Sequence, residues 1–500
     1  MAQATYPVLS ILLVPFYIRY LGLEAYGLVG FFVLIETLLG IFSKGFGVTF
    51  QREIARRDAE VQNRRTFRRL IRTFEIVYWA MGIVAALVLM SFSGALGRNW
   101  INVSNIPMAT VKATLILVAL RICLVMPKIL YSSSFIGTQK QTFSSMVETI
   151  TILAGALGQV AVVGITRSVI GFMVVQVITA AINVLLFRYF MEKRILPPLQ
   201  ESDPATFDFQ EVKNMSFFAL NMMWANGVGI IMLQMDRFFI SKFLPIAQLG
   251  VYNIGTAGGR LLNIFIGPVM IAMYPTTCQM ALDNEKEKFS AHIDRNLKIS
   301  VILCSTVAFP LCFFSHEILT LWIRKPDIVA SGTMVLAFYT LATLALAYAN
   351  VFYLVQKATG KLAYMSASNA AALLWYPVAM YFSVHRWGLL GAALANILYS
   401  VVELIVGAIV TYKVILRNTS FFRQLAFPLL MTMTAAIIMY IFKSVAVWFF
   451  PYSILGRLAF AGTGAIFIFG TLYLACFGFR VPQEFRQILT KVRGLSLSSN

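Results

Sequence analysis

The stretch VKATLILVALRICLVMPKILYSSSF, residues 111–135, decides the fold class. It is apolar for longer than the roughly 20 residues that a helix needs to cross a membrane. It nevertheless carries Arg121 near its middle and Lys128 seven residues later, which is almost two helical turns, so both cations project from one face. A guanidinium at mid-membrane is costly unless it faces a partner or a water-filled cavity. This stretch therefore predicts a transmembrane helix that lines a cavity for an anion.

The composition of the whole chain is that of a polytopic membrane protein. Its 500 residues are 59% hydrophobic and only 12% charged, and the mean hydropathy of +0.78 is far above that of soluble domains. A net charge of +20 would favour nucleic acid as the partner of a soluble protein. Here the cations cluster in short stretches between apolar runs, as they do in cytoplasmic loops, so we expect no nucleic-acid partner.

The hydropathy pattern predicts an all-α integral membrane fold with about fourteen transmembrane helices. They lie near residues 4–21, 26–47, 74–96, 111–135, 145–166, 170–190, 216–240, 247–274, 297–316, 332–355, 362–384, 389–412, 425–446 and 457–478. With the N-terminus inside, the inner loops and helix ends hold about 27 Lys and Arg and the outer ones about 10. Because cytoplasmic loops carry such an excess, both termini are expected in the cytoplasm.

A long polar stretch divides the chain. It contains Pro197, Pro198 and Pro204 with mixed charge, a composition typical of a linker. We expect a six-helix lobe at 1–191, a cytoplasmic linker at 192–214, a second six-helix lobe at 215–414, two further transmembrane helices at 415–480 and a cytoplasmic tail at 481–500.

Sequence landmarks recur between the two predicted lobes. Arg19-Tyr20-Leu21, followed by Gly27, returns 223 residues later as Lys242-Phe243-Leu244, followed by Gly250. Further pairs at nearly the same offset are Gly137 with Gly360 and Gly171 with Gly391. This pattern indicates a duplication. Because each lobe has an even number of spans, the repeat is parallel and a pathway would run between the lobes, with the last two spans at the periphery.

Arg260 is a second arginine near the middle of a predicted span, the eighth. It follows Gly258 and Gly259, which permit a close approach of backbones. We expect Arg121 from the first lobe and Arg260 from the second to bind an anion, with Lys128 nearby.

Basic residues also gather at the predicted inner ends of the helices. Lys44 and Arg52 lie at the inner mouth of the predicted pathway, where they either guide a phosphate inwards or anchor the chain. Residues 52–72 hold eight arginines against three acids. Such a run is typical of an amphipathic helix on the anionic lipids of the inner leaflet, and the alternative is a segment that catches a phosphorylated lipid headgroup.

Three acids are candidates for ion coupling or for ion pairs. Glu36 lies near the midplane of the second span and either pairs with Arg121 or has a functional role. Asp236 adjoins Arg237 towards the outer end of the seventh span, where an interhelical ion pair or snorkelling explains the two charges more simply than a functional role does. Glu148, in the fifth span, either carries a coupling proton or is structural.

No catalytic residue, cofactor or metal site is predicted. The three histidines do not combine with acids or cysteines at ligand or triad spacing, and we expect His292 in a polar loop. The five cysteines show no paired framework, and a phosphate-cradling Gly-rich motif is missing from the sequence. Transport would then be driven by an ion gradient, the membrane potential or the substrate gradient.

Several motifs resemble those of the polysaccharide-biosynthesis flippases, a family of the multidrug, oligosaccharidyl-lipid and polysaccharide exporter superfamily. They are Pro15, Arg19, Leu21-Gly22, Tyr26-Gly27, Gly45 to Gly47, Arg52 to Ala55, Asp236, Leu249 to Tyr252, Tyr274-Pro275 and Gly388 to Ala393. The resemblance implies two bundles in a V and alternating access. It also implies movement of an undecaprenyl-pyrophosphate-linked oligosaccharide from the inner to the outer leaflet of a bacterial inner membrane, and it adds Arg19 to the substrate-binding candidates.

The sequence thus predicts a flippase for surface-polysaccharide biosynthesis, with membrane lipids and glycan-assembly proteins such as a polymerase as further partners. A multidrug-type cation antiporter of the same superfamily would need a cavity dominated by acids, whereas Arg121, Lys128 and Arg260 outnumber Glu36 here. A membrane polymerase or ligase for lipid-linked sugars would need a large outer loop, and the predicted outer loops are short.

Overall fold

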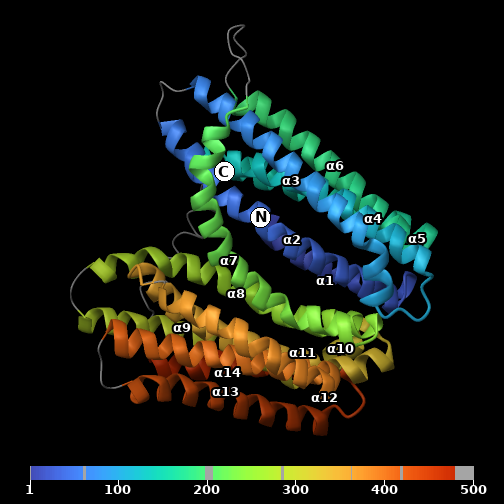
Figure 1. The fold of residues 1–500 in the computed structure, drawn as a ribbon. Helices are drawn as coiled ribbons and strands as arrows, with labels where there is room; N and C mark the ends of the chain where they lie inside the picture. The colour runs from blue at the N-terminus through green and yellow to red at the C-terminus, as the bar shows by residue number, and fades with distance from the viewer. Residues whose placement is uncertain are drawn as a thin grey trace, which may run out of the picture. The chain divides into compact units, whose positions relative to one another are not determined.

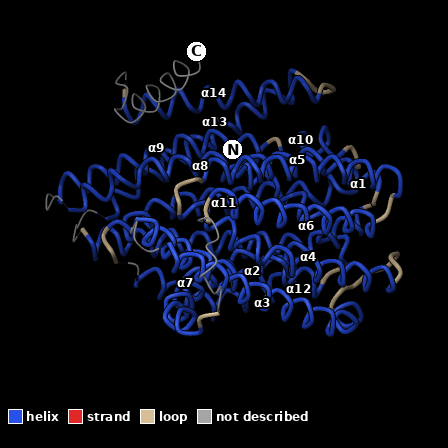
Figure 2. Tube along the Cα trace, turned by 90° about the horizontal axis from the view of Figure 1, so that it is seen from above, coloured by secondary structure: helices blue, strands red, loops and turns tan. Residues whose placement is uncertain are grey.

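The computed structural model describes residues 2–59, 64–196, 207–282, 286–361, 363–416 and 421–478. Figure 2 shows these residues as helices joined by short loops. The helices are α1 Ala2–Tyr20, α2 Leu23–Ala59, α3 Arg64–Asn99, α4 Met108–Gly137, α5 Gln141–Thr166, α6 Val169–Arg194, α7 Phe209–Phe243, α8 Ile246–Leu282, α9 Lys286–Phe313, α10 Ser315–Ile323, α11 Pro326–Ala358, α12 Ala363–Ile409, the π-helix η1 Val410–Ile415, α13 Phe421–Phe449 and α14 Ile454–Phe477. Of the predicted linker, residues 197–206 lie outside the described residues, whereas residues 192–194 end α6 and residues 209–214 begin α7.

The helices agree with the predicted membrane fold. Eleven of the described helices are long and apolar enough to cross a membrane, so the expected number of fourteen is approximate. Helix α12 contains two of the expected spans. They are separated at Gly388, whose φ of +56° interrupts the helical backbone. Helix α10 was not expected as a separate element, since its nine residues are too few to cross a bilayer.

The chain forms two compact units. Unit 1 comprises Met1–Ala257 and Ser366–Asn396, and unit 2 comprises Gly258–Met365 and Ile397–Asn500. Helices α8 and α12 therefore contribute to both units (Figure 1). The two-lobe division at residues 191 and 215 stays a prediction.

Helix α4 is central to unit 1, where it packs against α2, α3 and α6. Small residues allow this close packing: a Cβ added to Gly82 of α3 would lie only 2.8 Å from the backbone oxygen of Cys123 on α4. Since lipid tails are as apolar as leucine, van der Waals contact and interhelical hydrogen bonds hold such helices together. The apolar face of α4 is accordingly buried against its neighbours at Leu115, Ile122 and Phe135.

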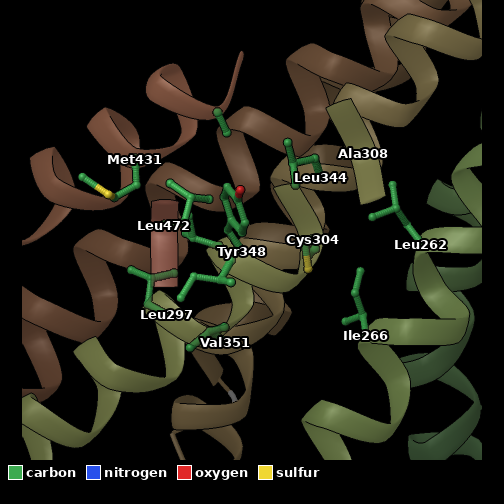
Figure 3. Packing of buried hydrophobic residues seen from close by; sticks show 14 of the residues in the cluster. Leu262, Ile266, Leu297, Cys304, Ala308, Leu344, Tyr348, Val351, Met431 and Leu472 are labelled. Atoms are coloured by element: carbon green, nitrogen blue, oxygen red, sulfur yellow. The ribbon is translucent and has the colours of Figure 1, made fainter. Parts of the chain in front are cut away.

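Unit 2 is built around α9, which packs against α11, α13 and α14. Its core includes Leu297 of α9 and Tyr348 of α11 together with Met431 of α13 and Leu472 of α14 (Figure 3). At one end, the buried carboxylate of Glu317 on α10 accepts hydrogen bonds from Lys443 of α13 and Arg457 of α14. The two C-terminal helices are thus fixed into unit 2 by both apolar and ionic contacts.

Candidate functional site

Both cations of α4 have acidic partners within unit 1. Arg121 donates a hydrogen bond to Oε2 of Glu36 on α2, and the two side chains are 24% and 25% exposed. Lys128 donates to Oε1 of Glu148 on α5, and its ammonium lies 5.7 Å from the ring centre of Phe187 on α6. Although the cations are seven residues apart on one helix, they reach acids on opposite neighbours. Pairing lowers the cost of placing both charges among apolar helices.

Arg260 lies on the unit 2 part of α8 and its side chain is exposed. The preceding glycines pack closely against α11: a Cβ on Gly258 would overlap Leu336, and one on Gly259 would lie 2.5 Å from Cδ1 of Tyr339. The atoms nearest to both glycines belong to side chains of α11, so these glycines make room for side chains, and the expected close approach of backbones is not what they serve. Arg121 and Arg260 belong to different units, and their meeting across a pathway stays a prediction.

Asp236 is the most deeply buried of the candidate acids, at 1% exposure. Its Oδ2 accepts hydrogen bonds from the hydroxyl of Tyr252 on α8, at 2.7 Å, and from Nδ2 of Asn396 on α12, at 3.1 Å. Asn396 also donates to the Tyr252 hydroxyl at 2.8 Å and accepts from the hydroxyl of Tyr376 at 2.7 Å. This network ties α7, α8 and α12 together inside unit 1. Asp236 and Tyr252 belong to the sequence motifs quoted above, whereas Asn396 and Tyr376 were not predicted.

Arg237 points to different partners from its neighbour Asp236. Its Nε donates to Oδ1 of Asn253 on α8 at 3.0 Å, and Nη1 donates to Oε1 of Gln234 at 2.8 Å. Arg237 as a residue is 9% exposed, and the hydrogen-bond partners of its guanidinium include these neutral amides. These side-chain oxygens accept the hydrogen bonds that a buried arginine needs at a helix interface, so a structural role is enough to explain Arg237.

Several of the basic residues gather at one end of unit 1, which we call the basic end and define by Arg52, Arg72 and Lys140. Lys44 and Arg52 have exposed side chains there. The arginine-rich segment is divided between the end of α2 and the start of α3, with residues 60–63 outside the described part. Arg19 lies in the last turn of α1, at the end of unit 1 opposite the basic end. Its side chain is exposed, and the guanidinium carbon lies 5.8 Å from the ring centre of Tyr20.

Glu75 connects three helices at the basic end through its carboxylate. The sequence did not identify it as a candidate residue. Its buried carboxylate accepts from the hydroxyl of Tyr131 at 2.6 Å and from Nη1 of Arg72 at 2.8 Å, and it lies 3.3 Å from Nε of Arg188. The network connects α3, α4 and α6. It holds part of the arginine-rich segment in place as structure.

The structure corrects the expectation that His292 lies in a polar loop. His292 is buried on α9, with its Nε2 3.2 Å from Oγ1 of Thr277 and 3.1 Å from Nδ2 of Asn296. Helix α9 begins at Lys286, about three turns before the expected span at 297–316. The hydropathy pattern did not reveal these first turns because they are polar. No cluster of three or more His, Cys, Asp or Glu side chains suited to a metal occurs among the described residues.

Comparison with known proteins places these helices in a family. The model of a family described as "Polysaccharide biosynthesis protein" matches residues 1–281, more than half of the chain. The chain belongs to this family. A relative from Shigella flexneri, named "Putative O-antigen transporter", is 22% identical over 403 residues, which are 78% of this chain and 91% of the relative.

Solved structures share the fold of this polysaccharide biosynthesis protein at low identity. A structure titled "Lipid II flippase MurJ, inward closed conformation" has a TM-score of 0.69 at 13% identity and covers 94% of this chain and 97% of its own. An inward-facing multidrug resistance transporter of the MATE family has a TM-score of 0.64 at 14% identity and covers 80% and 92%. The chain thus has the multi-pass membrane fold of these transporters, in agreement with its family membership and with the superfamily that the sequence motifs indicated. The alternative of a polymerase or ligase is wrong.

Proposed function

We propose that this protein is an alternating-access flippase that moves a polyprenyl-pyrophosphate-linked oligosaccharide from the inner to the outer leaflet of the bacterial cytoplasmic membrane. The product would serve the biosynthesis of a surface polysaccharide. Family membership and the name of the Shigella flexneri relative support this cargo class. In this topology both termini are cytoplasmic, and the basic end of unit 1 faces the cytoplasm.

The observation that carries the proposal is the ion pair between Arg121 and Glu36 in the midst of apolar helices. About a quarter of each side chain is exposed, so the guanidinium is held but remains accessible to a ligand. A pyrophosphate cannot cross hydrocarbon without partners that replace its water. An arginine that exchanges a carboxylate for a phosphate keeps its charge neutralised at every stage and offers two parallel hydrogen bonds.

The remaining candidates have graded roles in this proposal. Arg260, exposed on α8, supplies the second guanidinium from the other half of the repeat. Lys44 and Arg52 are exposed at the basic end and attract the anionic headgroup from the inner leaflet. Lys128 assists from about two turns further along α4, whereas its contact with Glu148 is mainly structural. Arg19 lies at the opposite end, where the cargo would leave.

A multidrug-type cation antiporter is the second candidate, and the burial of Asp236 favours it. Carboxylates inside membrane proteins commonly mark ion pathways, and this one is buried and accepts hydrogen bonds from Tyr252 and Asn396. The same residue fits the flippase as the site of ion coupling. The two functions differ in the charge of the cargo that the protein moves.

The test is export of a defined polyprenyl-pyrophosphate-linked oligosaccharide in sealed membrane vesicles. Replacing Arg121 or Arg260 by Ala should reduce export by at least about tenfold, because loss of one charge-assisted hydrogen-bonded contact costs about 1.5–3 kcal/mol. Lysine at either position should retain part of the activity. Arg98→Ala is the matched control, since Arg98 is an exposed arginine in the last turn of α3. Wild-type export from both Ala variants would refute the proposal.

A further inference from the structure

Helices α2 and α8 meet backbone to backbone within unit 1, at Gly27 and Gly250. A Cβ on Gly27 would overlap the carbonyl oxygen of Ile246 and lie 3.1 Å from the amide nitrogen of Gly250. A Cβ on Gly250 would lie 2.7 Å from the carbonyl oxygen of Leu23 and 3.2 Å from the amide nitrogen of Gly27. Each glycine thus faces the carbonyl one turn before the other glycine. Neither position has room for any side chain.

This reciprocal contact joins equivalent positions of the sequence repeat. Gly27 and Gly250 are 223 residues apart, as are Leu23 and Ile246. The glycines therefore mark the point at which the two copies cross, with a local two-fold relation between them. This explains why a glycine recurs at the same place in both copies.

The next layer of the crossing breaks the symmetry. Gly30 and Asn253 are also 223 residues apart, and a Cβ on Gly30 would overlap the side-chain amide of Asn253. That amide fills the space over Gly30, and its Oδ1 accepts a hydrogen bond from Nε of Arg237 at 3.0 Å. The crossing is therefore closed by bare backbone in one layer and by a hydrogen-bonded amide in the next.

The loop of residues 100–107 between α3 and α4, which we call the strap, lies at this end of unit 1, opposite the basic end. The backbone oxygen of Asn102 accepts from the N–H of Ile246 at 3.0 Å, and the oxygen of Asn99 accepts from Nζ of Lys242 at 2.6 Å. On the other side of the crossing, Glu24 accepts from the backbone N–H groups of Ser104 and Asn105. The strap thus holds the first turns of α2 and α8 beside each other.

A solvent-open recess of about 460 Å³ lies at the same end. Its lining comes from the turn before α2, from residues 104–106 and from the first residues of α8, including Leu23, Pro245 and Ala247. Leu23 is itself one of the residues whose carbonyl meets a glycine of the crossing. The recess therefore reaches the residues next to the crossing, where the backbones of α2 and α8 are in direct contact.

We propose that the Gly27–Gly250 crossing is the outer gate of the transporter. The inference rests on the proposed function, because a gate of this kind implies alternating access. Two glycines exclude water and ions by direct backbone contact, yet they form only weak Cα–H···O and van der Waals interactions. A gate made in this way seals tightly and separates without breaking a buried ion pair. Opening it moves the two repeats apart at the point where their equivalent residues touch.

Substitution of either glycine by alanine should hold the gate open. The added methyl group of Gly27→Ala collides with the carbonyl of Ile246, which is rigid helix backbone, so α2 and α8 must separate there. Gly250→Ala should act in the same direction through the oxygen of Leu23. Gly40→Ala is the matched control, because Gly40 is on α2 and a Cβ there meets nothing within 4 Å.

The experiment measures access from outside by a reporter cysteine. Ala257→Cys, in a background without the five native cysteines, places a thiol on α8 about 10 Å beyond Gly250 along the helix, at a side chain that is 4% exposed. A membrane-impermeant thiol reagent is then applied to the outer face of intact cells. With Gly27→Ala or Gly250→Ala we expect labelling about tenfold faster than with Gly40→Ala, as the balance shifts from the closed form to the open form.

Glu24→Ala provides a test that introduces no collision. It removes the acceptor of the strap, so labelling should rise in the same direction but by less. Equal labelling rates in Gly27→Ala, Glu24→Ala and Gly40→Ala would overturn the gate. Because labelling needs no cargo, the gate is judged apart from the proposed function: faster labelling together with normal export from the Arg121 and Arg260 variants would refute the cargo and leave the gate standing.

Discussion

Replacing Glu36 by glutamine separates a structural role of Arg121 from a role in binding. The variant keeps the shape of the side chain and removes the charge that Arg121 contacts. Arg121→Gln removes the other charge, and the double variant leaves two neutral amides that can still form a hydrogen bond with each other. Each variant perturbs the same contact between α2 and α4, but only those that contain Arg121→Gln lose the guanidinium.

The exposure of the pair sets the expected loss of stability. Removing one partner of a fully buried pair costs about 3–5 kcal/mol, whereas a fully exposed pair contributes only about 0.2–1 kcal/mol. With side chains 24% and 25% exposed, this pair is intermediate, so we expect each single variant to lose about 2 kcal/mol of unfolding free energy. The double variant should lose less than the sum of the two, with a coupling energy of about 1 kcal/mol or more.

Export should divide the variants in another way. If Arg121 binds the anionic cargo, Glu36→Gln frees the guanidinium from its competitor and keeps export, despite its lower stability. Arg121→Gln should lose export at a similar loss of stability. The measurements are unfolding of the purified protein in detergent and export of the lipid-linked oligosaccharide in vesicles, normalised to the amount of folded protein. Equal loss of export in both single variants would refute the reasoning and leave Arg121 as a structural residue.

Two further predictions concern the other networks. Burial alone would raise the pKa of Glu317, but the hydrogen bond and charge of Lys443, with the hydrogen bond from Arg457, bring that pKa below its ordinary value. The ionised carboxylate therefore stabilises the fold above the ordinary pKa of glutamate, about 4.3, and this contribution is lost as the pH falls through the lowered pKa. Between pH 5 and pH 3 the thermal unfolding midpoint of the wild type should fall further than that of Glu317→Gln, and parallel curves would contradict this role. In unit 1, Tyr252→Phe removes the hydroxyl that donates to Asp236 and accepts from Asn396. It should lower the unfolding free energy by about 1–3 kcal/mol, whereas an unchanged denaturation curve would show that the network contributes no stability.

The sequence predicts the helices well because hydropathy is a local property. Every expected span overlaps a helix, although the one at 297–316 runs from α9 into α10 and Gly388 interrupts the backbone between the two spans that share α12. The sequence also predicted the ion pair of Glu36 with Arg121 as one of two alternatives, because only a few charged residues lie within the spans. Helical turns made of polar residues were not predicted, and His292, in the polar first turns of α9, was therefore expected in a loop.

The partners of Asp236 could not be predicted from the sequence, for a different reason. Tyr252, Asn396 and Tyr376 are spread over two further helices, and one of these bonds joins residues 160 positions apart. Whether such side chains meet depends on how each helix is rotated about its axis, which apolar spans hardly encode. A helix that is apolar all round has no preferred face in its hydropathy pattern. The glycine crossing was visible as a repeat, but its contact became clear only from the backbone geometry.

The anchoring of α13 and α14 decides what a reporter at the C-terminal end of the protein can measure. Apolar contacts join these helices to α9 and α11 along their length, and Glu317 fastens both of them at one end. A fluorophore placed behind residue 478 would consequently follow the motions of unit 2. Paired with a second dye on unit 1, it would test by energy transfer whether the proposed transport cycle changes the distance between the two labels.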